Sequence, residues 1–256
     1  MSLVRVIPTL LLKGEGLIKT SQFKNPVYIG DPINAVRIFN EKEVDELILL
    51  DVTATAEKRE PKYNWIKDIV SESFMPVGYG GGIKNVEQAK KLFDTGIEKL
   101  IINSASLDFN FISSLAKIYG NQSIVICIDV RENLLGNYSI YTNNGTLKHK
   151  MTPEVMAKSV VNAGAGEIII QSIDKEGTMK GYDLDLIKIV SKTVNVPVVA
   201  SGGAGSQEHL KDAILKGGAS AVSAGSMFVF KGKHRGILIN YPSPTDLKNL
   251  FRETDL

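Results

Sequence analysis

Two pairs of small-residue turns are the segments of this sequence best suited to hold a phosphate-bearing molecule. Gly81-Gly82 follows one apolar run and Asn103-Ser104 follows the next, and Gly202-Gly203 with Gly225-Ser226 repeats the arrangement. Glycine lets the backbone approach an anion closely, and backbone amides near a helix start then donate to it. Each pair alone is compatible with a simple tight turn. The repetition favours a substrate with a phosphate at each end.

The repeat is regular, but one acidic residue breaks it. A single displacement of 121 residues relates Gly81-Gly82 to Gly202-Gly203 and Asn103-Ser104-Ala105 to Ala224-Gly225-Ser226, so the chain resembles two fused half-barrels, about 1–120 and 121–256. Asp129 ends an apolar run in the second half, whereas aligning the ends of the corresponding apolar runs, a displacement of 118 residues, places Leu11 at the matching position of the first half. A carboxylate can transfer a proton and leucine cannot.

Short β-branched runs alternate with longer amphipathic segments, which is typical of βα units around a parallel sheet. Eight of each in one domain of 256 residues predict a (β/α)8 TIM barrel, with a doubly wound sheet as the alternative. We expect strands near 4–12, 46–51, 75–79, 99–103, 123–129, 167–172, 197–201 and 220–224. We expect helices near 31–43, 62–73, 85–95, 108–119, 152–164, 183–193, 206–216 and 243–252.

Two inserts interrupt this alternation, and both follow strands, at the end of a barrel where active sites lie. Residues 14–30 are expected to form a long loop, and residues 138–142 followed by Asn144-Gly145 are expected to form a hairpin. Each insert is a candidate lid.

Composition excludes several classes of protein. The 30 basic and 28 acidic residues are spread evenly, so no basic stripe predicts nucleic acid or an anionic membrane as a partner. No apolar run approaches the ~18 residues of a membrane helix. The one cysteine, Cys127, lies in an apolar run and suits a reducing cytoplasm, and no metal-ligand spacing occurs. We therefore expect a cytoplasmic protein without a metal or cofactor.

Motifs along nearly the whole chain resemble the cyclase (HisF) subunit family of imidazole glycerol phosphate synthase. The motifs that carry the resemblance are Val6-Ile7-Pro8, Leu50-Asp51, Tyr79-Gly80-Gly81-Gly82-Ile83, Ile128-Asp129, Ser172-Ile173-Asp174, Gly177-Thr178, Gly181-Tyr182-Asp183, Ser201-Gly202-Gly203 and Ala224-Gly225-Ser226. The resemblance adds Gly177 to the expected phosphate-binding residues. It also implies a half-barrel duplication.

The resemblance implies that ammonia comes from a separate HisH-like glutaminase docked on the N-terminal face of the barrel. A ring of four charged residues gates the entry in that family, and the matching positions here are Arg5, Glu46, Lys99 and Glu167. Glu98 falls where the family contacts its glutaminase. Nothing in this chain resembles a glutaminase triad, so the glutaminase must be another subunit.

The chemistry that the resemblance implies uses two aspartates, as general acid and general base, at the ends of the first and fifth strands. Asp129 is the second of these, and Leu11 stands where the first belongs. Asp51, Asp174 and Lys19 are candidates for supporting roles: the two acids for ordering the site and the lysine for binding an anion.

With leucine in place of the first acid, the sequence resembles a divergent branch of the family that is found with surface-polysaccharide genes. Shared segments include the start Ile7–Lys13 and Phe23-Lys24-Asn25-Pro26. With a glutaminase and a third amidotransferase protein, that branch is implicated in converting an N-acetyl group on a sugar to an acetamidino group. The alternatives are imidazole ring closure in histidine biosynthesis and a non-catalytic scaffold that only conducts ammonia.

Overall fold

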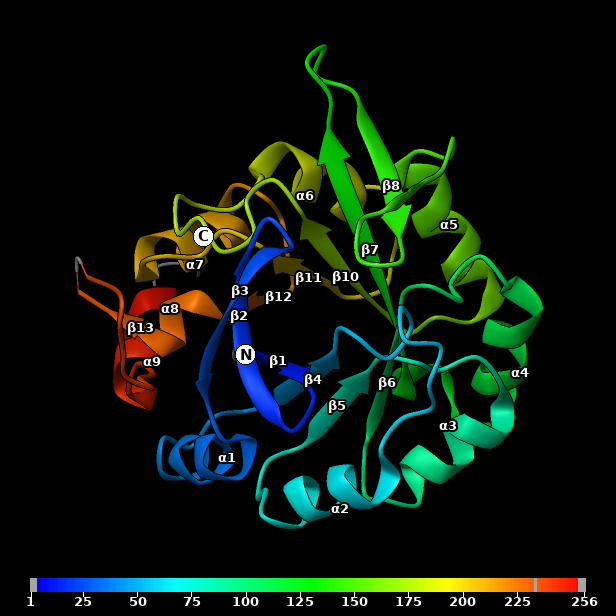
Figure 1. The fold of residues 1–256 in the computed structure, drawn as a ribbon. Helices are drawn as coiled ribbons and strands as arrows, with labels where there is room; N and C mark the ends of the chain where they lie inside the picture. The colour runs from blue at the N-terminus through cyan, green and yellow to red at the C-terminus, as the bar shows by residue number, and fades with distance from the viewer. Residues whose placement is uncertain (1–3, 233, 253–256) are drawn as a thin grey trace.

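Eight parallel strands close into a barrel in the computed structural model, which describes residues 4–232 and 234–252. The hydrogen-bonded order is β10-β11-β12-β1-β4-β5-β6-β7, and β7 pairs with β10 to complete the ring, with helices around the outside (Figure 1). This confirms the (β/α)8 fold. The barrel strands are β1 (Arg5–Lys13), β4 (Leu47–Asp51), β5 (Val77–Gly80), β6 (Lys99–Ile102), β7 (Ile124–Glu132), β10 (Glu167–Ser172), β11 (Val198–Ser201) and β12 (Ala221–Ala224).

The barrel strands are apolar on both faces because helices cover the outside and other strands face the inside. Successive side chains point in opposite directions, so each strand contributes to two separate cores. On β7, Ile124, Ile126 and Ile128 pack outward against helices, whereas Val125 and Cys127 belong to a smaller cluster inside the barrel. The continuous Ile- and Val-rich runs seen in the sequence follow from this double burial.

Polar caps start several of the helices that cover the barrel. The side chains of Asp31, Asn85, Asp108, Asp183 and Ser206 each accept a hydrogen bond from a backbone amide of the following first turn. The helices are α1 (Pro32–Glu41), α2 (Tyr63–Ser71), α3 (Val86–Phe93), α4 (Phe109–Tyr119), α5 (Pro153–Ala163), α6 (Leu184–Ser191), α7 (Gln207–Leu215), α8 (Ser226–Val229) and α9 (Pro244–Arg252), with a 3₁₀ turn at Asn121–Ser123.

The eighth unit is more elaborate than the sequence indicates. The one-turn helix α8 and the small ribbon of β13 (Phe230–Lys231) and β14 (Gly236–Ile237) come before the outer helix α9. Tyr241 ties this segment to the first strand, because its hydroxyl donates to the Val6 carbonyl at 2.7 Å. No helix within the described residues is long and apolar enough to cross a membrane.

The first insert is a β-hairpin and not the loop expected for residues 14–30. Strand β2 (Gly16–Ser21) pairs antiparallel with the end of β1 and with β3 (Lys24–Gly30). Its turn contains Gln22 and Phe23, with positive φ angles of 53° and 63°. Two-residue hairpin turns with positive φ at both positions usually carry glycine or asparagine. Because Gln22 and Phe23 occupy these positions, the sequence does not predict the turn.

The second insert forms the predicted hairpin and one more. Strand β8 (Tyr138–Thr142) pairs with the long end of β7, and β9 (Leu147–Lys148) pairs with β8 across a turn that contains Asn144 and Gly145. The β7–β8 hairpin projects well beyond the barrel, whereas the β8–β9 turn bends back toward the ends of the strands (Figure 1).

Candidate functional site

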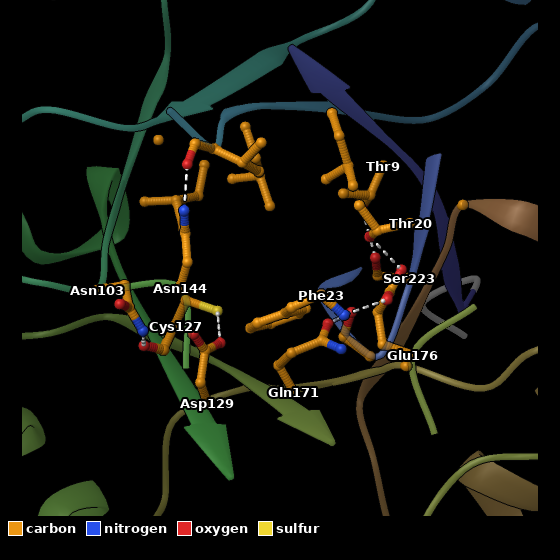
Figure 2. Close-up of a pocket in the computed structure, with 18 of the residues that line it drawn as sticks. Thr9, Thr20, Phe23, Asn103, Cys127, Asp129, Asn144, Gln171, Glu176 and Ser223 are labelled. Carbon is orange, nitrogen blue, oxygen red and sulfur yellow. Dashed lines mark hydrogen bonds between the residues drawn. The ribbon is translucent and has the colours of Figure 1, made fainter. Parts of the chain in front are cut away.

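A cavity of about 200 Å³ opens at the carboxyl ends of the barrel strands. All eight barrel strands, or the loops that follow them, contribute to its wall, and Figure 2 shows the side chains that project into it. Most of the residues predicted for the site meet here: Leu11, Lys19, Asp51, Gly81, Gly82, Asn103, Ser104, Asp129, Gly177, Gly202, Gly203, Gly225 and Ser226.

The two repeated glycine pairs have matching geometry. Gly81 and Gly202 both have positive φ angles, 126° and 90°. A Cβ on Gly81 would come within 2.4 Å of the Asp51 carbonyl oxygen, and one on Gly202 within 2.5 Å of the Ser172 carbonyl oxygen. Only glycine fits either position, and the missing side chains leave backbone open to the cavity.

Asp129 lies on β7, three residues before the strand ends, where it lines the cavity and is 6% exposed. Burial raises the pKa of its carboxyl group to about 7, against the opposing effect of hydrogen bonds from Cys127 and Asn103. The Cys127 Sγ lies 3.5 Å from Asp129 Oδ1. A carboxyl group that titrates near neutral pH can both accept and donate a proton at the working pH.

Two leucines lie on the cavity wall opposite Asp129. Strand β1 is four places from β7 in either direction around the ring, so Leu11 on β1 faces Asp129 across the barrel. Leu11 is aligned with Leu50 of β4, and both side chains line the cavity. Directly across the cavity from the Asp129 carboxyl group there is thus a leucine, and the carboxylate on that side, Asp51, is paired with Arg59.

The two candidate supporting acids have different surroundings. Asp51 lines the cavity, but its Oδ1 accepts from Arg59 Nη2 at 2.7 Å and from the amides of Thr53 and Ala54. It thereby orders the loop after β4. Asp174 does not line the cavity, because its Oδ2 accepts from the Glu132 amide at 2.9 Å on the projecting hairpin.

Both inserts named above as candidate lids place a side chain in the cavity wall, and so does Glu176, which the sequence did not indicate. The tip of the β2–β3 hairpin places Phe23 in the cavity, and the β8–β9 turn brings Asn144, whose amide donates to the Val52 carbonyl. Glu176 fixes the first of these hairpins: its carboxylate accepts from the Phe23 amide and from the Thr20 hydroxyl, each at 3.1 Å. Figure 2 shows the Phe23 ring between Asp129 and Glu176.

Replacing Glu176 with alanine is expected to release the β2–β3 hairpin. The variant loses both carboxylate bonds, so amide hydrogens in residues 16–30 should exchange at least about tenfold faster while the barrel strands keep their protection. Hydrogen exchange read by mass spectrometry measures this. Glu208→Ala, at an exposed position on α7, is the matched control. Unchanged exchange in residues 16–30 would show that Glu176 does not hold the hairpin.

Four charged side chains form a closed ring at the other end of the barrel, where the strands begin. Arg5 pairs with Glu46 and Glu167, and Lys99 pairs with the same two carboxylates at 2.9 Å. The charges balance within the ring. These are the four residues predicted for an ammonia gate.

An apolar layer separates the ring from the cavity. Two residues beyond each ring member, on the same inward face, stand four isoleucines: Ile7, Ile48, Ile101 and Ile169. The next inward layer, including Thr9 and Gln171, already lines the cavity. The barrel axis therefore passes from a charged ring through an apolar layer to the cavity.

The face around the ring carries exposed residues suited to a protein partner. Glu98 is exposed just before β6, and its amide donates to the Val77 carbonyl at the start of β5. Phe74, in the turn before β5, is 90% exposed, which the sequence did not indicate. Within 4–232 and 234–252, no group of three His, Cys, Asp or Glu side chains is placed to hold a metal ion.

Comparison with known proteins adds a family match over most of the chain. Residues 5–235 match the family described as histidine biosynthesis protein. A protein of Pseudomonas aeruginosa, provisionally named imidazole glycerol phosphate synthase subunit hisF2, is 51% identical over 244 residues, covering 95% of this chain and 97% of that protein. A provisionally named HisF subunit of Leptospira interrogans is 48% identical over 249 residues, covering 96% and 98%.

More distant relatives carry the name without qualification. The imidazole glycerol phosphate synthase subunit HisF of Leptospira biflexa is 38% identical over 228 residues, covering 88% of this chain and 89% of that protein.

Proposed function

The chain belongs to the histidine biosynthesis protein family, and from that premise we propose that it is the ammonia-using synthase subunit of a glutamine amidotransferase complex. We propose further that its reaction is not imidazole ring closure. It forms an acetamidino group from the N-acetyl group of a phosphate-bearing sugar, for a surface polysaccharide or related glycan. A HisH-like glutaminase supplies the ammonia.

The observation that carries the finer proposal is the pairing of Asp129 with Leu11 across the cavity. Ring closure, as the resemblance implies it, needs proton transfer from two opposite sides of the substrate. Here one side holds a carboxyl group whose pKa is about 7, and the other holds leucine. Addition of ammonia to the acyl carbon of an N-acetyl group needs a base on one side of the substrate only. The methyl group of that N-acetyl group suits the side of the cavity that carries Leu11.

The course of the ammonia follows the axis of the barrel. Neutral ammonia can cross the apolar layer of Ile7, Ile48, Ile101 and Ile169, whereas ammonium would lose its hydration there at a large cost. When the ammonia nitrogen bonds to the acyl carbon, the Asp129 carboxylate takes the proton that the nitrogen releases. The acyl oxygen is first phosphorylated by a nucleoside triphosphate and then leaves as phosphate, and we assign that phosphorylation to a third amidotransferase protein.

The glutaminase docks, in this proposal, on the face where the strands begin. The charge ring lies at that face, and Glu98 and Phe74 are exposed beside it. An exposed aromatic side chain is a common anchor at protein interfaces, and a nearby carboxylate adds polarity to the rim. Ammonia released there enters the barrel without crossing solvent.

Complementation tests the choice between amidination and ring closure. The chain, expressed with its glutaminase, is expected not to rescue a histidine auxotroph that lacks the cyclase subunit, because Leu11 cannot transfer a proton. Leu11→Asp in the same background is the comparison, since it restores the second acid. Rescue by the parent chain would overturn the amidination proposal and favour ring closure.

A further inference from the structure

Lys19 is a buried amine with one hydrogen-bond partner among the described residues. It is 4% exposed on strand β2, and its Nζ donates to the Thr9 carbonyl oxygen at 2.5 Å. No carboxylate oxygen of the described residues lies within 4.0 Å of this nitrogen, although the charge of Glu176 acts on it from a greater distance. An ammonium has three donors and is costly to bury without an anion, so this group needs a further partner.

Gly225 creates the space that the amine occupies. A Cβ on Gly225 would lie 2.0 Å from Lys19 Nζ and 3.0 Å from both Lys19 Cε and the Thr9 carbonyl oxygen. The amine is therefore seated directly on the backbone at the end of β12. The buried Ser226 hydroxyl follows in the chain and also lines the cavity. We call Lys19, Gly225 and Ser226 the lysine seat.

The other phosphate turn, at the ends of β5 and β6, has no comparable cation. Among the described residues that line the cavity, Lys19 is the one lysine or arginine. Arg59, behind Asp51, is bound by the carboxylates of Asp51 and Glu57 at 2.7 and 2.6 Å. The Asn103 amide is bound to the Cys127 carbonyl at 3.0 Å. A group bound at this turn meets neutral donors and the nearby carboxyl groups of Asp51 and Asp129.

We propose that the two turns bind chemically unequal ends of the substrate: the lysine seat binds a phosphate monoester dianion, and the turn of Gly81, Gly82, Asn103 and Ser104 binds a phosphodiester or a neutral polar end. This rests on the proposed function only in taking the substrate to bear phosphate. The geometry matches a molecule with one highly charged end better than one with a dianion at each end.

Charge explains the preference. The lysine seat combines a desolvated ammonium with backbone amides opened by glycine, and hydrogen bonds from a charged donor are about twice as strong as neutral ones. A dianion at the opposite turn would face like charge from ionised Asp129, and among the described residues no lysine or arginine lines the cavity at that turn. The two turns therefore share the glycine geometry but differ in the charge that surrounds a bound group.

Titration with inorganic phosphate, followed by calorimetry or phosphorus NMR, tests the proposal. The parent chain is expected to bind one phosphate well before any second. Lys19→Met should weaken that site at least about tenfold, and Gly225→Ala should do the same with the lysine still present, because the added methyl group displaces the amine. Ser104→Ala, at the opposite turn, is the control and should change the affinity less than about twofold.

Lys19→Met removes a buried charge and so is expected to keep the fold, which melting temperatures check for every variant. Unchanged phosphate affinity in Lys19→Met would overturn the proposal. So would two equal phosphate sites in the parent, no phosphate binding in the parent, or an equal loss in Ser104→Ala. These readouts need no amidination. A chain that shows the Lys19 effect but forms no acetamidino product would contradict the proposed function alone.

Discussion

Replacing Asp129 with asparagine is expected to lower glutamine-driven product formation about 10³-fold. The variant keeps the shape and hydrogen-bonding groups of the side chain but cannot accept the proton of the attacking nitrogen, and positioned bases contribute roughly 10² to 10⁴ in rate. In the parent, the rate should rise as pH increases through about 7, because Asp129 acts as the carboxylate and its pKa is about 7. Single-turnover assays across pH measure both effects.

Asp174→Asn is the matched control, since the same chemical change occurs outside the cavity, where Asp174 holds the Glu132 amide. Its rate should stay within a few-fold of the parent. Full activity in Asp129→Asn would mean that the barrel only conducts ammonia and that another protein performs the chemistry.

Unfolding cannot explain the loss in Asp129→Asn, because this variant should be at least as stable as the parent. The folded pKa of Asp129, about 7, is raised above its ordinary value of 3.8 by burial. The unfolded chain therefore releases this proton first, and the parent loses stability as pH rises from about 4 to 7. Asparagine avoids that loss, so its free energy of unfolding above pH 7 should exceed the parent's by up to about 4 kcal/mol.

Replacing Lys99 with methionine is expected to uncouple glutamine hydrolysis from synthesis. The variant leaves Glu46 and Glu167 with Arg5 as their remaining partner in the ring, so the balanced ring gains a negative charge that attracts and holds ammonium. Product formed from glutamine should fall at least about tenfold while glutamine hydrolysis continues. Product formed from added ammonium salt, which enters at the substrate end, should change less than about twofold. Assays with the two nitrogen sources measure the ratio.

Stability provides a second readout for the ring. Breaking a mostly buried ion pair costs about 3 kcal/mol, so Lys99→Met should also lower the free energy of unfolding by that order. Lys91→Met, which removes an exposed ion pair with Glu87 on α3, is the control and should change neither quantity appreciably. An equal loss with both nitrogen sources would assign the ring a structural role alone.

The barrel was predictable from sequence because each strand is an apolar run buried on both faces, as in β7. The β2–β3 hairpin was not, because Gln22 and Phe23 adopt positive φ without a glycine or asparagine to signal the turn. Glu176 escaped notice for another reason: its partner Phe23 lies 153 residues away. Lys19 was predicted from the sequence as a residue that could bind an anion. Its contact with Gly225 was not predictable, because it joins the hairpin after the first barrel strand to the turn after the last one.

Side chains along β1 point alternately to the outer core and to the cavity, so a substitution that changes the chemistry of the cavity need not change the stability of the barrel. Leu10 and Leu12 anchor the strand in the outer core, whereas Leu11, between them, lines the cavity. A substitution at position 11 changes what the enzyme can react with while leaving the helices' packing intact. A lineage can therefore change the chemistry of the cavity through one inward-facing residue and keep the packing of the barrel unchanged.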